Sequence, residues 1–155
     1  MNNRMRSVVL GMAVVAALLG GCASVPMASL EKDEQAKAFK VKPGTSNIYL
    51  YRNESFGGAV KMDVELDGKP MGKTAERTFF QFAVSPGRHT LLSRAENDSQ
   101  LELITLEGRN YFVWQEVKAG VWFARNKLQL VDEPTGIVGV RECYLIQFPV
   151  PAATP

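Results

Sequence analysis

The sequence predicts an all-β fold: an antiparallel β-sandwich of about seven or eight short strands, preceded by a cleaved signal peptide and a short tether. Three observations lead to this prediction. Apolar and charged residues alternate along segments such as 61–66, a period typical of a strand with one buried face. Turn residues separate these segments about every eight to twelve residues. With 155 residues in total, the chain has room for one domain.

The first 21 residues have the parts of a secretory signal peptide. Arg4 and Arg6 give a positively charged start, and an apolar run extends from Val8 to Leu19. This run suits a signal peptide but is too short to cross a hydrocarbon core of roughly 30 Å as a helix. We therefore expect residues 1–21 to be removed, which leaves 134 residues.

The apolar run ends in Leu19-Gly20-Gly21-Cys22, which resembles the lipobox of bacterial lipoproteins. That resemblance implies cleavage between Gly21 and Cys22, a diacylglyceryl group on the Cys22 sulfur and usually a third, amide-linked acyl chain. Two or three chains hold a protein at a membrane, whereas one binds reversibly. Ala23 replaces the aspartate that favours inner-membrane retention, which implies the outer membrane. The alternatives are a secretory peptide with an incidental cysteine, or an uncleaved anchor.

Residues 22–44 are small, polar and charged, and we expect them to form a tether. Pro26 and the pair Pro43-Gly44 interrupt regular structure. Ser29 is placed to cap a short helix that continues to about Phe39.

Period-two alternation begins after the tether, and the predicted β-sandwich domain covers residues 45–148. Asp67-Gly68 supplies the positive φ of a tight hairpin, and Pro86-Gly87 marks another turn. The predicted strands are 47–52, 61–66, 69–73, 78–84, 88–95, 100–106, 109–117 and 121–131.

The segment after residue 131 has two interpretations. Residues 132–135 read as a helix start with an acidic cap and an early proline, although Gly136 and Gly139 weaken a helix. Residues 144–148 favour a last strand instead. We expect the proline-rich residues 149–155 to form a flexible tail.

Charge excludes one class of partner. Of the 18 basic residues, Arg4 and Arg6 lie in the leader, so the mature part has 16 basic and 16 acidic residues. Nucleic-acid binding needs a basic excess that displaces counterions, and we expect no such partner. The sequence shows no metal-ligand spacing, phosphate-binding loop or paired catalytic carboxylates. We therefore expect no metal, no cofactor and no enzymatic activity.

Three aromatic residues are candidates for binding a ligand: Tyr111, Trp114 and Trp122. Exposed rings on neighbouring strands would stack on a sugar or a peptide stem, whereas burial in the core is the alternative. Phe112 and Trp114 share one face of their strand, and Tyr111 and Val113 share the other. A strand that is apolar on both faces lies centrally or turns one face to a ligand.

His89 is the only histidine, and no nucleophile-elbow motif accompanies it. We interpret it as a strand residue that is hydrogen-bonded or exposed. If Cys22 is acylated, Cys143 has no partner within the chain, and it is either a buried apolar residue or a thiol that pairs between molecules. Three arginines would form either an anion site or ordinary ion pairs and solvated edges: Arg52, Arg94 and Arg125.

Several short motifs occur in a fixed order along the chain. They are Gly21-Cys22-Ala23, residues 37–39, Ile48-Tyr49-Leu50-Tyr51-Arg52, Leu66-Asp67-Gly68, Pro86-Gly87-Arg88-His89, and Gly108 followed by Tyr111-Phe112-Val113. Together they resemble the bacterial lipoprotein family catalogued as domain of unknown function 2846. This resemblance implies a compact β-sandwich and supplies no catalytic residues. The turns are also similar, in architecture alone, to the surface modules named for a Pro-Glu-Gly-Ala motif.

These observations predict a membrane-anchored, non-enzymatic binding or structural module on the periplasmic face of the outer membrane. Its expected partners are the membrane, through the acyl chains on Cys22, and an envelope protein or peptidoglycan. A glycan- or peptidoglycan-binding module that uses the exposed aromatic rings is the alternative.

Overall fold

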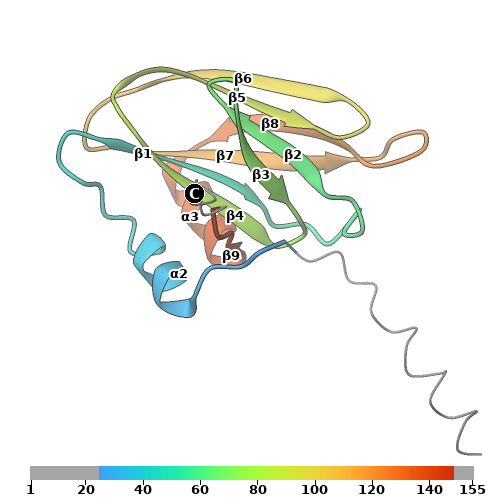
Figure 1. The fold of residues 1–155 in the computed structure, drawn as a ribbon, viewed down its shortest axis with the longest axis horizontal. Helices are drawn as coiled ribbons and strands as arrows, with labels where there is room; N and C mark the ends of the chain where they lie inside the picture. The colour runs from blue at the N-terminus through green and yellow to red at the C-terminus, as the bar shows by residue number, and fades with distance from the viewer. Residues whose placement is uncertain (1–24, 149–155) are drawn as a thin grey trace, which may run out of the picture.

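Residues 25–148 are described by a computed structural model, in which two β-sheets stack on each other (Figure 1). One sheet has five strands in the order β8-β7-β1-β4-β9, and the other has four in the order β3-β2-β5-β6. The elements are α2 (Leu30–Ala36), β1 (Ser46–Arg52), β2 (Met62–Leu66), β3 (Lys69–Thr74), β4 (Thr78–Val84), β5 (Gly87–Arg94), β6 (Asp98–Thr105), β7 (Asn110–Lys118), β8 (Arg125–Val131), α3 (Glu133–Arg141) and β9 (Tyr144–Leu145).

The predicted all-β sandwich is confirmed, and most strand pairs are antiparallel. The pairs β1–β7 and β4–β9 are parallel. The parallel direction of β1 and β7 has a local cause. The loops that precede these two strands contact each other at one end of the sandwich. Gly108 donates its N–H to the carbonyl of Thr45 at 2.8 Å, so β1 and β7 start side by side and run the same way.

The main core lies between the two sheets. In β2 the predicted alternation is confirmed, because Met62, Val64 and Leu66 are buried. The facing sheet contributes side chains from β1, β4 and β7 to the same core: Ile48, Leu50, Phe80, Phe82 and Val113.

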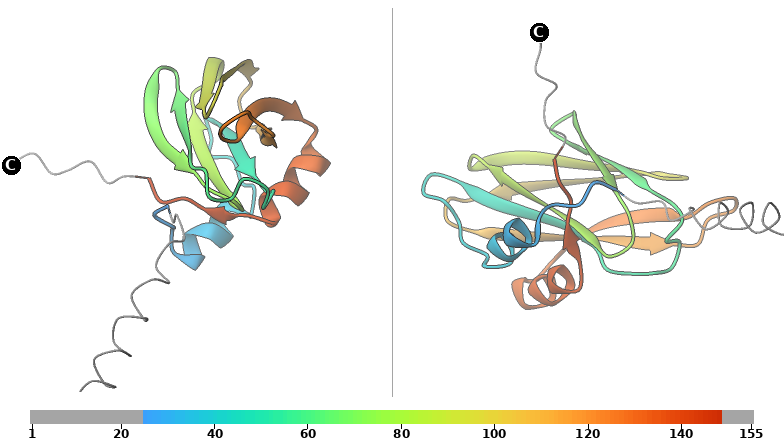
Figure 2. Two further views of the ribbon diagram at one scale, coloured as in Figure 1. Left: turned by 90° about the vertical axis from the view of Figure 1, so that its right-hand side faces the viewer. Right: turned by 60° about the horizontal axis from the view of Figure 1, so that its bottom comes forward.

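The five-stranded sheet is covered on its outer face as well. Tyr49 and Tyr51 of β1 point away from the main core into a second apolar cluster with Phe79 and Phe112. The helices α2 and α3 contribute Ala36 and Val140 to that cluster. In the left view of Figure 2, both helices lie on the side of this sheet that faces away from the other sheet. Every residue of β1 is therefore buried.

Both interpretations of the segment after residue 131 are found in the structure. The helix α3 forms first, and the short strand β9 follows it. Asp132 caps the helix by accepting the N–H of Thr135 at 2.8 Å. A Cβ at Gly136 would lie 2.1 Å from the Phe112 ring. The residues that weaken the helix by propensity are thus the ones that let it lie against the sheet.

The expected tether over residues 22–44 differs from the structure, in which residues 25–44 belong to the folded unit. Val25 is buried in the main core, and Met27 forms a bridge with Ile146. Asp33 of α2 accepts the N–H of Leu145 at 2.7 Å. Ser29 caps α2 as predicted, although the helix ends at Ala36. The physical reason is that β9 lies at the edge of its sheet, where its unpaired backbone groups bind Ala28 and Asp33.

The predicted signal peptide, Cys22 and the predicted tail at 149–155 lie outside the described residues. Within residues 25–148, no helix has the length and apolar character needed to cross a membrane.

Candidate functional site

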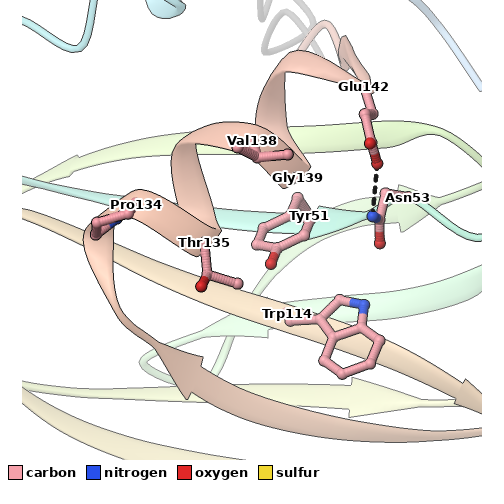
Figure 3. A pocket seen from close by; sticks show the side chains of 8 residues that line it. All are labelled: Tyr51, Asn53, Trp114, Pro134, Thr135, Val138, Gly139 and Glu142. Atoms are coloured by element: carbon pink, nitrogen blue, oxygen red, sulfur yellow. Dashed lines mark hydrogen bonds between the residues drawn. The ribbon is translucent and has the colours of Figure 1, made fainter.

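A groove opens between α3 and the outer face of the five-stranded sheet, with a volume of about 520 Å³ (Figure 3). Its floor comes from β1 and β7, and one wall comes from α3. The lining residues are Tyr51, Asn53, Trp114, Pro134, Thr135, Val138, Gly139 and Glu142.

The strand register and the helix period together build the groove. Tyr51 and Trp114 are register partners in the parallel pair β1–β7, so their side chains stand beside each other on one face. Along α3, residues 135, 138, 139 and 142 have the spacing of a single helix face. Because Gly139 has no side chain, the backbone of α3 packs directly against the Tyr51 ring. The groove stays open on the side of Trp114.

Two polar atoms in the groove lack hydrogen-bond partners. Asn53 donates its Nδ2 to Oε2 of Glu142 at 2.7 Å, as Figure 3 shows, but its buried Oδ1 accepts nothing. Nε1 of Trp114 is also buried and unpaired. An unsatisfied buried polar group costs about 1–3 kcal/mol. The groove therefore holds one unpaired donor and one unpaired acceptor beside its aromatic floor.

Tyr51 and Glu142 are the titratable side chains that line the groove. Burial, with smaller contributions from neighbouring acidic groups, raises the pKa of Tyr51 to about 12, so its hydroxyl stays protonated at neutral pH. The lining contains no histidine, cysteine or serine. Elsewhere in residues 25–148, no three metal-binding side chains of histidine, cysteine, aspartate or glutamate gather into a possible site.

The three candidate aromatic residues do not form one surface. Tyr111 and Trp114 lie on opposite faces of β7, and the Tyr111 hydroxyl accepts the N–H of Leu106 at 2.9 Å. Trp114 lines the groove, whereas Trp122 is 84% exposed in the loop between β7 and β8.

The predicted strand 121–131 begins later than expected, at Arg125. The reason is a competing acceptor for the backbone of residues 121–123. The carboxylate of Glu96 accepts the N–H groups of Val121, Trp122 and Phe123, which are therefore not paired in the strand ladder.

His89 is hydrogen-bonded through both ring nitrogens, one of the two arrangements expected for it. Nδ1 lies 2.7 Å from Oδ2 of Asp67, and Nε2 lies 2.8 Å from the carbonyl oxygen of Ser85. Burial lowers the pKa of His89, but the bonds to Asp67 and Ser85 outweigh it and the net shift is upward. Both partners are acceptors, so His89 ties two turns together and has no free nitrogen to act as a base.

The arginines do not form an anion site. Arg94 pairs with Glu65 at 2.8 Å, and Arg125 is exposed at the start of β8. Arg52 is buried and donates to backbone carbonyls. Cys143 is a buried residue, and burial raises the pKa of its thiol to about 12.

Asn53 and Glu142 are groove residues that the sequence did not reveal. They lie 89 positions apart, and each stands next to a regular element rather than in a motif. Trp114 was the one signal for this site, and the strand alternation around it correctly indicated a face distinct from that of Tyr111.

Comparison with known proteins places the chain in a family without an assigned activity. The model of a protein family of unknown function, DUF2846, matches residues 42–127, from just before β1 into β8. An uncharacterized protein of Haemophilus influenzae is 39% identical over 124 residues, which cover 79% of this chain and 74% of that protein. No solved structure matches. The ordered motifs, the sandwich and these matches together show that the chain belongs to the DUF2846 family.

Proposed function

We propose that this protein is a lipid-anchored, non-enzymatic binding module of the bacterial cell envelope, held at the periplasmic face of the outer membrane. The observation that carries the proposal is the lipobox-like sequence ending at Cys22, directly before the fold. Val25, the first described residue, is already buried in the main core, and cleavage after Gly21 would leave it and all later residues in place.

The short distance between Cys22 and the fold defines where the module would work. Three residues span at most about 11 Å when fully extended. Acyl chains on Cys22 would therefore hold the edge formed by Val25 and β9 next to the bilayer. A partner would be met close to the membrane surface rather than across the periplasm.

Metabolic labelling tests the anchor. Bacteria that express the full chain are fed an alkyne analogue of palmitate, and the purified protein is examined for label. We expect labelled wild-type protein, an unlabelled Cys22→Ala variant that keeps its leader, and normal labelling of the control Cys143→Ala. Label on the Cys22→Ala variant, or none on the wild type, would reject the anchor. Separation of inner and outer membranes by density then tests the proposed location.

A second candidate function is glycan binding in the groove beside α3. It is favoured by the aromatic side chains of Tyr51 and Trp114 next to the unpaired Nε1 of Trp114 and Oδ1 of Asn53. A sugar ring presents an apolar face for stacking and hydroxyl groups that both donate and accept hydrogen bonds.

Titration of the variant Trp122→Phe, which keeps Trp114 as its one indole, with a soluble disaccharide-peptide fragment of peptidoglycan tests this candidate through Trp114 fluorescence. We expect Asn53→Ala to weaken binding about tenfold, equivalent to about 1.4 kcal/mol. The control is Gln100→Ala, on the exposed surface of β6. Absence of binding, or equal binding by both variants, would reject glycan binding in the groove.

A further inference from the structure

Four large apolar side chains are exposed at one end of the sandwich. Phe56 lies in the loop between β1 and β2 and is 61% exposed. Val121, Trp122 and Phe123 lie in the loop between β7 and β8 and are 78%, 84% and 68% exposed. Both loops are at the right-hand end of the molecule in Figure 1. We call these four side chains the apolar tip.

The two loops pack together at their bases. A Cβ at Gly57 would lie 3.1 Å from the side chains of both Ala124 and Val117, across the junction of the loops. Beneath them, Met62 joins Val117 and Ala124 in a small buried cluster. The apolar tip therefore stands on a packed base, and its four side chains are left outside that base.

The β7–β8 loop is held in shape by a carboxylate. The two oxygens of Glu96 accept the N–H groups of Val121, Trp122 and Phe123 at 2.9, 2.8 and 2.7 Å. The N–H of Glu96 donates in turn to the carbonyl of Ala124 at 3.2 Å. These bonds lower the pKa of Glu96, which keeps the carboxylate charged at neutral pH. The loop is thus braced in a conformation that presents its apolar side chains to solvent.

The β1–β2 loop is held by a buried cation. Arg52 donates from Nη1 to the carbonyl of Val60 and from Nη2 to the carbonyl of Gly57, both at 2.7 Å. Removing a guanidinium from water is unfavourable unless it gains such hydrogen bonds. Both carbonyls follow Phe56 in this loop, and the bond to Gly57 fixes the backbone next to the exposed Phe56 side chain.

We propose that the apolar tip inserts into the interfacial region of a lipid bilayer. All four side chains are more than 60% exposed, so the tip projects from the sandwich. A folded protein partner would need a matching socket, whereas lipid chains rearrange around any shape. Tryptophan is also enriched where hydrocarbon meets headgroups, because its ring is apolar and its N–H is polar.

The position at which the described chain begins is consistent with a bilayer at the apolar tip. This argument rests on the proposed acylation of Cys22. The lipid would lie within about 11 Å of Val25, the reach of three residues. Val25 lines one small pocket together with Lys61, the last residue of the β1–β2 loop, so the described chain begins beside a loop that carries part of the tip. Acyl chains and tip would form two membrane contacts that orient the groove relative to the bilayer.

Fluorescence quenching by brominated lipid tests the insertion. The acylated protein is reconstituted into phosphatidylcholine vesicles whose acyl chains carry bromine, and flotation confirms that it is bound. The variant Trp114→Phe leaves Trp122 as the only indole, and Trp122→Phe leaves Trp114. We expect Trp122 emission to fall roughly twofold or more relative to unbrominated vesicles, since an interfacial indole contacts acyl chains. Trp114 emission should not change.

A second pair of variants tests the hydrogen bonds between Glu96 and the β7–β8 loop. Glu96→Ala keeps Trp122 but removes the acceptor of three N–H groups, so quenching of Trp122 should weaken. Glu102→Ala, which removes an exposed carboxylate from β6, is the matched control and should leave quenching unchanged.

The outcomes separate this inference from the proposed function. Unquenched Trp122 in vesicle-bound protein overturns insertion and leaves the acyl anchor intact. Protein that carries no lipid and does not float rejects the anchor instead. Insertion is then decided by adding vesicles to that same protein: a blue shift of Trp122 emission supports it, and an unchanged spectrum overturns it.

Discussion

Gly139 of α3 lies directly against the ring of Tyr51 in β1: a Cβ on the glycine would be 2.1 Å from Cε2 of the tyrosine. We predict that Gly139→Ala destabilises the protein by about 1–3 kcal/mol, the usual cost of overpacking. That loss occurs although alanine favours a helix by up to about 1 kcal/mol over glycine.

Urea unfolding measures this change, with Val138→Ala as the control on the same helix, since the Val138 side chain is 58% exposed. The control should alter stability by less than about 0.5 kcal/mol. A stabilised Gly139→Ala protein would mean that α3 does not lie this close to the sheet.

Gln115 connects the two sheets through the core. Its Oε1 accepts the hydroxyl of Thr74 at 2.6 Å, and its Nε2 donates to the hydroxyl of Ser93 at 2.6 Å. We expect Gln115→Leu to cost about 1–3 kcal/mol, because buried hydroxyls lose their partner. The urea midpoint checks this, and Gln100→Leu on the exposed face of β6 is the control. Equal midpoints for the two variants would contradict the connection.

The pair His89–Asp67 makes stability depend on pH. Since the pKa of His89 is raised in the fold, its contribution is present below the ordinary value of about 6.5 and is lost as pH rises through the raised pKa. The pKa of Asp67 is lowered: burial opposes this, but the bonds from His89 and Thr90 outweigh it. Its contribution is therefore lost in acid, below about pH 4.

Unfolding measured at a series of pH values checks this pair. Wild-type protein should lose up to about 1 kcal/mol between pH 6 and alkaline pH from this source, the usual size for a partly exposed pair. The variant His89→Gln should show a flatter profile over that range. A profile identical to that of the wild type would show that the bond has no energetic effect.

Cys143 should be chemically inert in the folded protein. Its side chain is buried, its Sγ lies 3.3 Å from the carbonyl oxygen of Arg52, and its pKa is raised to about 12 by burial first. A thiol reacts as the thiolate, so a chromogenic disulfide reagent should label it only after unfolding. Rapid labelling of native protein would instead support the alternative of a thiol that pairs between molecules.

Much of the sandwich could be predicted from local pattern. Alternation located β2 and Asp67-Gly68 located its hairpin, since both depend on residues that are neighbours in sequence. The groove could not be predicted in the same way. It needs α3 to cross β1 and β7, and the glycines that allow this look unfavourable when only helix propensity is considered.

The two largest differences between the sequence prediction and the structure have the same physical origin. Residues 25–44 look like a tether by composition, but Ala28 and Asp33 bind the sheet edge at β9, and the carbonyl of Phe39 accepts a bond from Asn110. Residues 121–123 look like a strand by their apolar character, but Glu96, which lies 25 to 27 positions earlier, takes their N–H groups. In both cases a contact distant in sequence overrides the local preference.

The proposed function depends most on the chemistry at Cys22, where the folded domain would meet the membrane. Mass spectrometry of the N-terminal fragment of protein purified from bacterial membranes tests this directly. We predict a chain that begins at Cys22 and carries a diacylglyceryl thioether. An intact leader, or an unmodified thiol at that residue, would contradict the proposed lipid anchor.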